Sequence, residues 1–184
     1  MKNTSKTLWV LRGMAEAIDW DSVYESGLPR IFNYFLYKVG DRDLTQDLAA
    51  TTFERAWSLR WKYRAGIASV PTWLFGIARN VMREHLRGRV YASESLNTAP
   101  RIENMPASID VEESVQQQQE KEHLRSLLNE LAQREQDLIA LKYGARLTNR
   151  EIARVTGLSE SNVGSTLHRT VTELRRRWQD EHRR

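Results

Sequence analysis

Residues 147–169, LTNREIARVTGLSESNVGSTLHR, constrain the fold of this chain most strongly, because they carry start and stop signals for two consecutive helices. Thr148 and Glu151 form a capping box, in which each residue can satisfy an orphan backbone donor of the other. Gly157 follows, and glycine readily takes the left-handed conformation that ends many helices. Ser159 can then cap a second helix. The pattern predicts a helix-turn-helix or, as the alternative, an ordinary helical hairpin within a core.

The second of these helices, about residues 159–177, has one apolar and one polar face. The residues expected to face inward have helical spacing: Val163, Leu167, Val171 and Leu174. The residues expected on the opposite face are short or basic: Ser161, Asn162, Ser165, Thr166, His168 and Arg169. The N-terminal part of a recognition helix enters the major groove, where such side chains reach base edges. Residues 175–177 are three arginines, which suit phosphates but also occur on solvated faces.

Composition excludes several classes of function. The 184 residues include no cysteine, which removes disulfides, thiolate metal sites and cysteine nucleophiles and fits a reducing cytoplasm. The four histidines show no metal-ligand spacing, and no glycine-rich phosphate loop or nucleophile constellation occurs. We therefore expect no catalytic residue, metal or cofactor. The apolar run TLWVL is far too short for a transmembrane helix or a signal peptide, so we expect a cytoplasmic protein.

Helical periodicity dominates the rest of the chain, which predicts an all-α fold of two small helical domains. A short leading helix is expected, with four residues on one face: Leu8, Leu11, Ala15 and Ile18. A helix is expected over residues 23–39 with its end at Gly40, and the next is expected to be capped by Asp43. Pro71 suits the first turn of a further helix that continues to about Arg89.

An acidic segment separates the two predicted domains. Residues 93–122 contain seven acids and two bases, a net charge of −5, and few large apolar residues. From about Glu120 a new helix is expected, with Leu124, Leu127, Leu128 and Leu131 inward. The predicted organisation is an N-terminal domain over residues 1–92, a flexible acidic linker over 93–119, and a C-terminal helix-turn-helix domain over 120–184.

The N-terminal domain has its own basic region. Residues 53–89 contain eight bases and two acids, a net charge of +6, and Arg79, Arg83 and Arg87 share one helix face. Aromatic residues are interleaved with this charge: Trp57, Trp61, Tyr63, Trp73 and Phe75. Single-stranded nucleic acid binds to such surfaces because bases stack on rings while phosphates pair with arginine. We expect Trp73 and Phe75 to belong to the core, and for the other three both roles stay open.

Three segments taken together resemble a known family. DLTQDLAATTFERAW, TWLFGIARNVMREHLR and LTNREIARVTGLSESNVGSTLHR are similar to segments of bacterial RNA polymerase sigma factors of the extracytoplasmic-function (ECF) group. The resemblance covers residues 23–177. It implies a protein without catalytic residues that binds core RNA polymerase, directs it to promoter DNA and opens the duplex near the start site. It also implies an anti-sigma factor as a partner, whose identity the sequence does not name.

The resemblance assigns roles to residues of the N-terminal domain. The helix over residues 43–57 corresponds to the surface that docks on the largest polymerase subunit, where Asp47 and Phe53 match the family and Gln46 and Ala50 depart from it. Residues 65–70 correspond to a loop that pockets a flipped base of the start-proximal promoter element. The residues expected to contact that element are Trp57, Trp61, Arg79, Asn80, Arg83 and Arg87.

The resemblance also assigns the C-terminal domain to the upstream promoter element. Gly164 and Thr166 replace basic residues that are frequent in the family, so the expected base readers are Ser165, His168 and Arg169, with Ser161 and Asn162 near phosphates. The acidic linker would thread basic channels of the polymerase, or serve as a solvated spacer. The competing hypothesis is a helix-turn-helix regulator that acts without polymerase and senses a ligand through its N-terminal domain.

Overall fold

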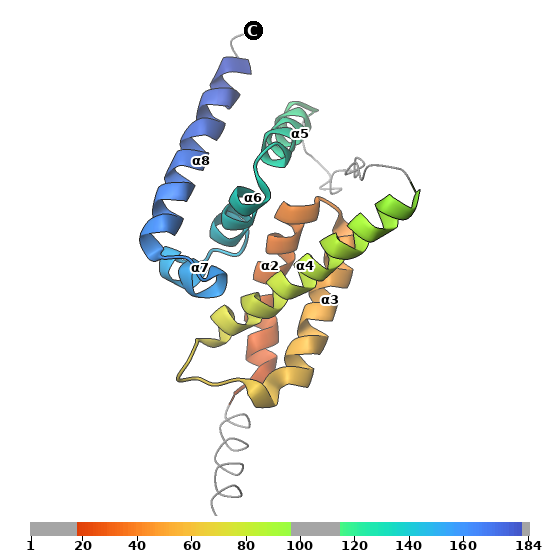
Figure 1. The fold of residues 1–184 in the computed structure, drawn as a ribbon, viewed down its shortest axis with the longest axis vertical. Helices are drawn as coiled ribbons and strands as arrows, with labels where there is room; N and C mark the ends of the chain where they lie inside the picture. Colours follow the sequence, from red (N-terminus) through yellow and green to blue (C-terminus); the bar gives the residue numbers. More distant parts are fainter. Residues whose placement is uncertain (1–17, 97–114, 182–184) are drawn as a thin grey trace, which may run out of the picture.

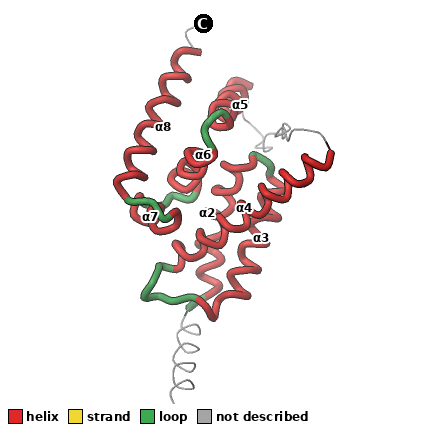
Figure 2. Tube along the Cα trace, in the orientation of Figure 1, coloured by secondary structure: helices red, strands yellow, loops and turns green. Residues whose placement is uncertain are grey.

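The structure is a computed structural model that describes residues 18–96 and 115–181, and within these ranges it consists of helices joined by short turns and loops (Figures 1 and 2). The predicted all-α class is confirmed. The predicted leading helix lies outside the described residues except for Ile18.

Helix α2 (Trp20–Val39) begins earlier than predicted because Asp19 caps it. The Asp19 carboxylate accepts hydrogen bonds from the backbone N–H groups of Asp21, at 3.1 Å, and Ser22, at 3.2 Å. The helix ends at Gly40 as predicted, with φ at 70°, where glycine avoids the steric cost that other residues meet.

Helix α3 (Arg42–Leu59) starts two residues earlier than a cap at Asp43 would allow. Asp41 caps it, since its carboxylate accepts a hydrogen bond from the Leu44 N–H at 2.8 Å. The prediction that Asp43 is the cap was wrong. Asp43 lies within the first turn, where the positive end of the helix dipole stabilises its negative charge.

Helix α4 (Val70–Leu96) follows a short 3₁₀ turn, η1 (Arg60–Lys62), and a loop. Pro71 stands in its first turn as predicted, and the helix continues beyond the expected end at Arg89. Buried side chains of α2 and α4, including Ile31, Phe35, Leu74 and Phe75, form the centre of the N-terminal domain together with the inner face of α3. Phe75 is thus a core residue, as predicted.

The C-terminal domain contains α5 (Val115–Asn129), α6 (Gln133–Ile139), a π-helical turn η2 (Ala140–Gly144), α7 (Asn149–Thr156) and α8 (Glu160–Glu181). The turn η2 extends α6 in a wider form, in which the Ala145 N–H donates to the Ala140 carbonyl at 2.9 Å. Helix α8 is the longest of this domain and runs alongside α5 and α6 (Figure 1).

Helix α5 corrects two sequence expectations. Leu127 and Leu131 are buried and Leu128 is partly buried, as predicted, but Leu124 is 43% exposed on the outer face. The helix also begins before Glu120, and α4 continues to Leu96, so both ends of the segment predicted as a linker are helical. Residues 97–114, the middle of that segment, lie outside the described residues.

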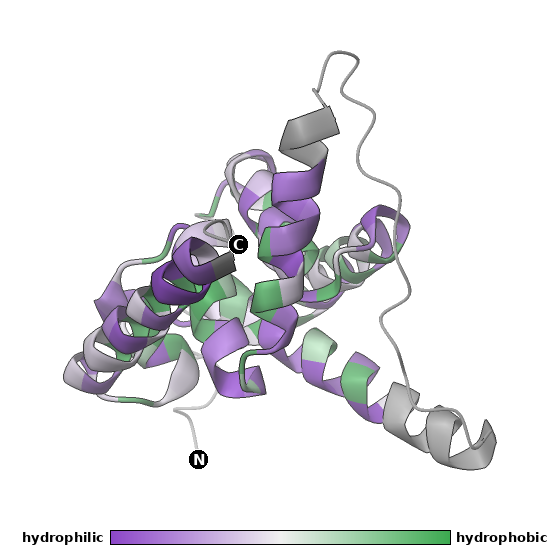
Figure 3. Ribbon diagram, turned by 90° about the horizontal axis from the view of Figure 1, so that it is seen from above, coloured by the Kyte–Doolittle hydropathy of each residue, from purple (hydrophilic) through white to green (hydrophobic). Residues whose placement is uncertain are grey.

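The two domains pack directly against each other. Helix α2 lies against η2, α4 lies against α7, and the buried side chains of both domains form one continuous cluster. Figure 3 shows hydrophobic and hydrophilic residues alternating along these helices. We call this contact, of α2 with η2 and of α4 with α7, the seam.

Candidate nucleic-acid interface

The helix-turn-helix predicted from residues 147–169 is present. Glu151 Oε2 accepts hydrogen bonds from the N–H and the hydroxyl of Thr148, both at 2.8 Å, and Thr148 Oγ1 accepts one from the Glu151 N–H at 3.2 Å. Gly157 ends α7 with φ at 78°. Ser159 caps α8, because its hydroxyl accepts a hydrogen bond from the Asn162 N–H at 3.2 Å. Each local signal therefore has the role predicted for it.

Five of the six residues predicted on the polar face of α8 are exposed: Ser161, Asn162, Ser165, His168 and Arg169. The sixth expectation was wrong, since Thr166 is 6% exposed and its hydroxyl donates to Asn162 Oδ1 at 3.2 Å. Arg134 of α6 donates to the same oxygen at 3.1 Å. No local sequence pattern indicates this contact, in which Arg134 of α6 binds Asn162 in the first turn of α8.

Gly164 lies beside α7 on the edge of this face. A Cβ at that position would lie 3.4 Å from the Asn149 amide nitrogen, which is close to ordinary contact, and Asn149 in turn accepts a hydrogen bond from Lys142 Nζ at 2.9 Å. Packing therefore does not demand a glycine at this position.

The arginines of residues 175–177 differ in their surroundings. Arg176 and Arg177 both bind Glu173, and they also pair with Asp180 and Glu130, respectively, at 3.0 Å. Their hydrogen bonds lower the pKa of Glu173 to about 2. Arg175 is exposed and has no ion pair within the described residues. Of the three, Arg175 is the one that presents a free guanidinium for a phosphate.

In the N-terminal domain, two tryptophans form an exposed cluster with Arg60. The Arg60 guanidinium carbon lies 4.0 Å from the centre of the Trp57 ring and 4.5 Å from that of Trp61. The two tryptophans are 53% and 45% exposed, respectively. The question left open by the sequence is therefore answered for them: they are surface residues, with ring area available for stacking.

The other aromatic residues shape the adjoining loop. Trp73 is partly buried, as predicted, with its ring 5.4 Å from that of Tyr63. The Tyr63 hydroxyl donates to the Ala68 carbonyl at 3.0 Å, which fixes the loop of residues 63–69. Within the loop, Ile67 is 77% exposed. The loop is thus tied at its base and open at its tip.

The predicted basic stripe of α4 is divided by the seam. Asn80, Arg83 and Arg87 are exposed. Arg79 instead forms an ion pair with Asp137 of α6, with 2.9 Å between Nε and Oδ2, and donates from Nη1 to the Val155 carbonyl at 2.6 Å. Sequence periodicity could not show this, because the partners lie 58 and 76 residues away.

Two further titratable groups lie beside Asp137. The Tyr34 hydroxyl donates to Asp137 Oδ1 at 2.9 Å, and burial, followed by the Asp137 charge and this hydrogen bond, raises the pKa of Tyr34 well above its ordinary value. Arg79 and Arg83 act in the opposite direction on that pKa. Burial also lowers the pKa of Lys38, and Arg79 lowers it further, while Asp137 raises it. No sequence pattern predicts these contacts, because their partners lie far apart along the chain.

The predicted polymerase-docking residues of α3 differ in exposure. Asp47 is exposed, together with Gln46 and Ala50. Phe53 is partly buried, with its ring 4.8 Å from that of Tyr24 and packed over Gly27. Phe53 therefore contributes to the packing of α2 on α3, whereas Asp47 is available to a partner.

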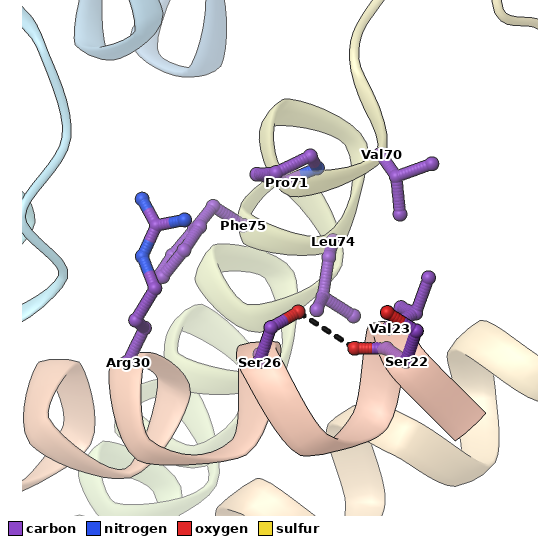
Figure 4. Close-up of a pocket in the computed structure, with 9 residues that line it drawn as sticks. Ser22, Val23, Ser26, Arg30, Val70, Pro71, Leu74 and Phe75 are labelled. Carbon is purple, nitrogen blue, oxygen red and sulfur yellow. Dashed lines mark hydrogen bonds between the residues drawn. The ribbon is translucent and has the colours of Figure 1, made fainter. Parts of the chain in front are cut away.

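A small hollow lies between α2 and the start of α4 (Figure 4). Its lining includes Ser22 and Ser26, linked by a 2.7 Å hydrogen bond from the Ser26 hydroxyl to the Ser22 carbonyl, and Arg30, whose guanidinium lies 5.7 Å from the Phe75 ring. None of its lining residues is a histidine or a carboxylate. The hollow thus offers no general acid or base.

Two other kinds of site are missing from residues 18–96 and 115–181. No three histidine, cysteine or carboxylate side chains lie close enough to hold a metal ion. No helix in these ranges has the length and apolar character needed to cross a membrane.

Comparison with known proteins gives matches in both domains. Residues 23–90 match the family Sigma-70 region 2, and residues 121–174 match Sigma-70, region 4. ECF RNA polymerase sigma factor BldN of Streptomyces coelicolor is 25% identical over 168 residues, which are 91% of this chain and 63% of BldN, so this chain spans less than two thirds of that relative. ECF RNA polymerase sigma factor RpoE of Cereibacter sphaeroides is 29% identical over 183 residues, 94% of this chain and 96% of RpoE.

A solved structure has the same fold. The sigma factor RpoE of Bartonella quintana, determined in complex with the anti-sigma factor NepR, superposes with a TM-score of 0.72 at 18% sequence identity. The alignment covers 86% of this chain and 95% of that protein.

Proposed function

This chain belongs to the ECF group of sigma-70 factors, and on that premise we propose that it binds core RNA polymerase, directs it to particular promoters and opens the duplex near the start site. One observation carries the proposal. A helix-turn-helix suited to duplex DNA and an exposed Trp57–Arg60–Trp61 cluster suited to single strands occur in the same chain. A regulator that only binds duplex DNA has no use for the second surface.

The exposed face of α8 reads the upstream promoter element in this proposal. Ser165, His168 and Arg169 reach base edges, and Ser161 and Arg175 lie near phosphates. Asn162 takes a positioning role through its contacts with Arg134 and Thr166.

The N-terminal domain binds the start-proximal element once it is melted. Arg83 and Arg87 suit the phosphate backbone, Trp57 and Trp61 offer stacking surfaces, and the loop of residues 63–69 with Asn80 receives an extruded base. Extruding a base costs a few kcal/mol, which contacts of this kind can offset. Asp47 on the exposed face of α3 docks on core polymerase.

The chemistry of RNA synthesis belongs to the polymerase, so we assign no catalytic residue, metal or cofactor to this chain. It acts in the cytoplasm, where polymerase and chromosome are. An anti-sigma factor is a further partner in this proposal, supported by the related fold that was solved in complex with NepR.

Run-off transcription tests the proposal. Purified core polymerase is incubated with genomic DNA fragments, with and without the chain, and permanganate detects unpaired thymines near the start sites. We expect discrete transcripts and local melting only when both proteins are present. Sequence-specific binding by the chain alone, with no transcript and no melting on any fragment, would instead favour the polymerase-independent regulator.

A further inference from the structure

The seam between the domains is centred on the Asp137 carboxylate. Its Oδ1 accepts a hydrogen bond from the Tyr34 hydroxyl and its Oδ2 pairs with Arg79, both at 2.9 Å. Tyr34 is fully buried, and the side chains of Arg79 and Asp137 are each 17% exposed. Both oxygens of the Asp137 side chain, which belongs to the C-terminal domain, are therefore bound by residues of the N-terminal domain. Charge-assisted hydrogen bonds between side chains that are largely shielded from solvent are stronger than ion pairs on the surface.

Backbone contacts on both sides of Asp137 continue the seam. Arg30 Nε donates to the Ala145 carbonyl at 2.9 Å, and Arg79 Nη1 donates to the Val155 carbonyl at 2.6 Å. Gly144 lies so close to α2 that an added Cβ would be 2.9 Å from the Asn33 carbonyl oxygen, a backbone atom. The two domains thus fit each other in shape as well as in charge.

Arg79 links this seam to DNA binding. It shares a helix face with Arg83 and Arg87, which are exposed and assigned above to the phosphate backbone of the start-proximal element. A guanidinium binds carboxylates and phosphates with the same donor geometry. While Asp137 is bound to it, Arg79 is unavailable to a phosphate.

We propose that Asp137 is a latch: in the free protein it occupies Arg79 in place of a DNA phosphate and holds the two domains closed, so that start-proximal DNA binding and domain separation are coupled. The latch itself concerns the free chain, and only its competition with DNA rests on the function proposed above. A ligand that binds Arg79 only in the open state must shift the equilibrium toward that state. Coupling of this kind is reciprocal, so removal of the latch strengthens DNA binding.

Two substitutions of different chemistry release the latch. Asp137→Asn removes the charge with almost no change of shape. Gly144→Ala changes no charge but places a methyl group against the backbone of α2. Asp180→Asn is the control for loss of an ion-paired carboxylate within α8, and Gly88→Ala is the control for a helical glycine, since a Cβ at Gly88 meets nothing within 4 Å.

The distance between the domains is the first measurement. The chain contains no cysteine, so cysteines introduced at the exposed Ala50 of α3 and Ser126 of α5 carry a specific pair of spin labels in the full-length protein. Double electron–electron resonance should give one short, narrow distance distribution for the wild type and both controls. Asp137→Asn and Gly144→Ala should shift the distribution to longer, broader distances. Circular dichroism verifies that helix content is retained.

The second measurement is binding of a fluorescent 12-nucleotide single-stranded DNA of random sequence, followed by anisotropy. Both latch variants should bind it more tightly by roughly 5- to 150-fold, the usual range of coupling between sites, and the controls should bind as the wild type does. Unchanged distances in both latch variants would overturn the latch. Longer distances with unchanged oligonucleotide binding would overturn the competition for Arg79. If Asp137→Asn loses its helix content, Gly144→Ala alone decides. If the latch variants show longer distances between the domains but the wild-type chain supports no transcription, the latch is upheld and the proposed function is refuted.

Discussion

Replacement of Arg169 by alanine distinguishes base reading from phosphate binding on α8. Arg169 is exposed, and no described residue forms a hydrogen bond or ion pair with it. Its removal should therefore change the free energy of unfolding by less than about 0.5 kcal/mol, as is usual for surface positions. A change in the DNA affinity of Arg169→Ala can then be attributed to lost contacts with DNA and not to loss of folded protein.

The size of the expected loss follows from the type of contact. An arginine that binds a guanine with two hydrogen bonds discriminates against other bases by about 1–3 kcal/mol. At about 1.4 kcal/mol per factor of ten, this corresponds to roughly a 5- to 150-fold loss in affinity. The loss should be confined to the preferred sequence at one base pair, because the other positions are read by other side chains.

Arg175→Ala is the matched control, since Arg175 lies on the same helix, is exposed and has no ion pair within the described residues. If it contacts a phosphate, its removal should weaken binding to all sequences alike. It should also reduce the slope of log K against log salt by about 0.9. The same arginine-to-alanine substitution is thus expected to cause a sequence-specific loss of affinity at Arg169 and a uniform loss at Arg175.

The assay begins with selection of the upstream element from a random duplex library by the complex with core polymerase. Fluorescence anisotropy then gives the affinity of each variant for the selected duplex and for its complete set of single base-pair substitutions, at two salt concentrations. A loss for Arg169→Ala that is uniform across the set would refute base reading by this residue. A large drop in its unfolding temperature would refute the claim that it has no structural role.

Three further predictions address other parts of the protein. Asp47→Lys should weaken pull-down of core polymerase with no change in thermal unfolding, whereas Glu25→Lys, on the exposed side of α2, should leave it intact; equal pull-down by both would remove the docking assignment. Asn80→Ala should reduce permanganate reactivity on duplex promoters more than on templates with a pre-melted bubble, where the unpairing cost is already met. A defect equal on both templates would contradict the assignment. Stability that depends on neutral Tyr34 should be complete below its unfolded pKa near 10 and decline at higher pH, because burial raises the folded pKa. Lys38 titrates beside it with the opposite shift, so urea unfolding of wild type and Tyr34→Phe must be compared; parallel alkaline profiles would refute the prediction.

The parts of the fold that local signals determine could be predicted from the sequence. The capping box of Thr148 and Glu151, the glycine ends at Gly40 and Gly157, and the proline start at Pro71 each depend on residues within one helical turn. The cap of α3 was misassigned because Asp41 and Asp43 both precede the same apolar run, and only the folded backbone shows that the Asp41 carboxylate accepts the hydrogen bond from the Leu44 N–H.

The errors in the candidate site arose where residues distant in sequence meet. Thr166 is buried, and the Asn162 oxygen that its hydroxyl contacts also accepts a hydrogen bond from Arg134 of α6. Arg177 pairs with Glu130, 47 residues earlier. Arg79 fits a basic stripe by spacing alone, and only the docking of the C-terminal domain removes it from the surface. Helical periodicity describes one helix at a time and carries no information about such partners.

The π-helical turn η2 has a consequence for comparing this chain with its relatives. A π turn takes up more residues than an α turn, so every residue after it is rotated relative to the course that a regular α6 would follow. Gly144 ends this turn and faces α2, and α7 and α8 follow it. Deleting a single residue from Ala140–Gly144 would thus re-aim the whole helix-turn-helix while leaving every residue of α8 unchanged. When promoter preferences are inferred from aligned α8 residues, a one-residue gap must be allowed inside this helix as well as in the loops. Otherwise, identical recognition residues would be compared in different orientations.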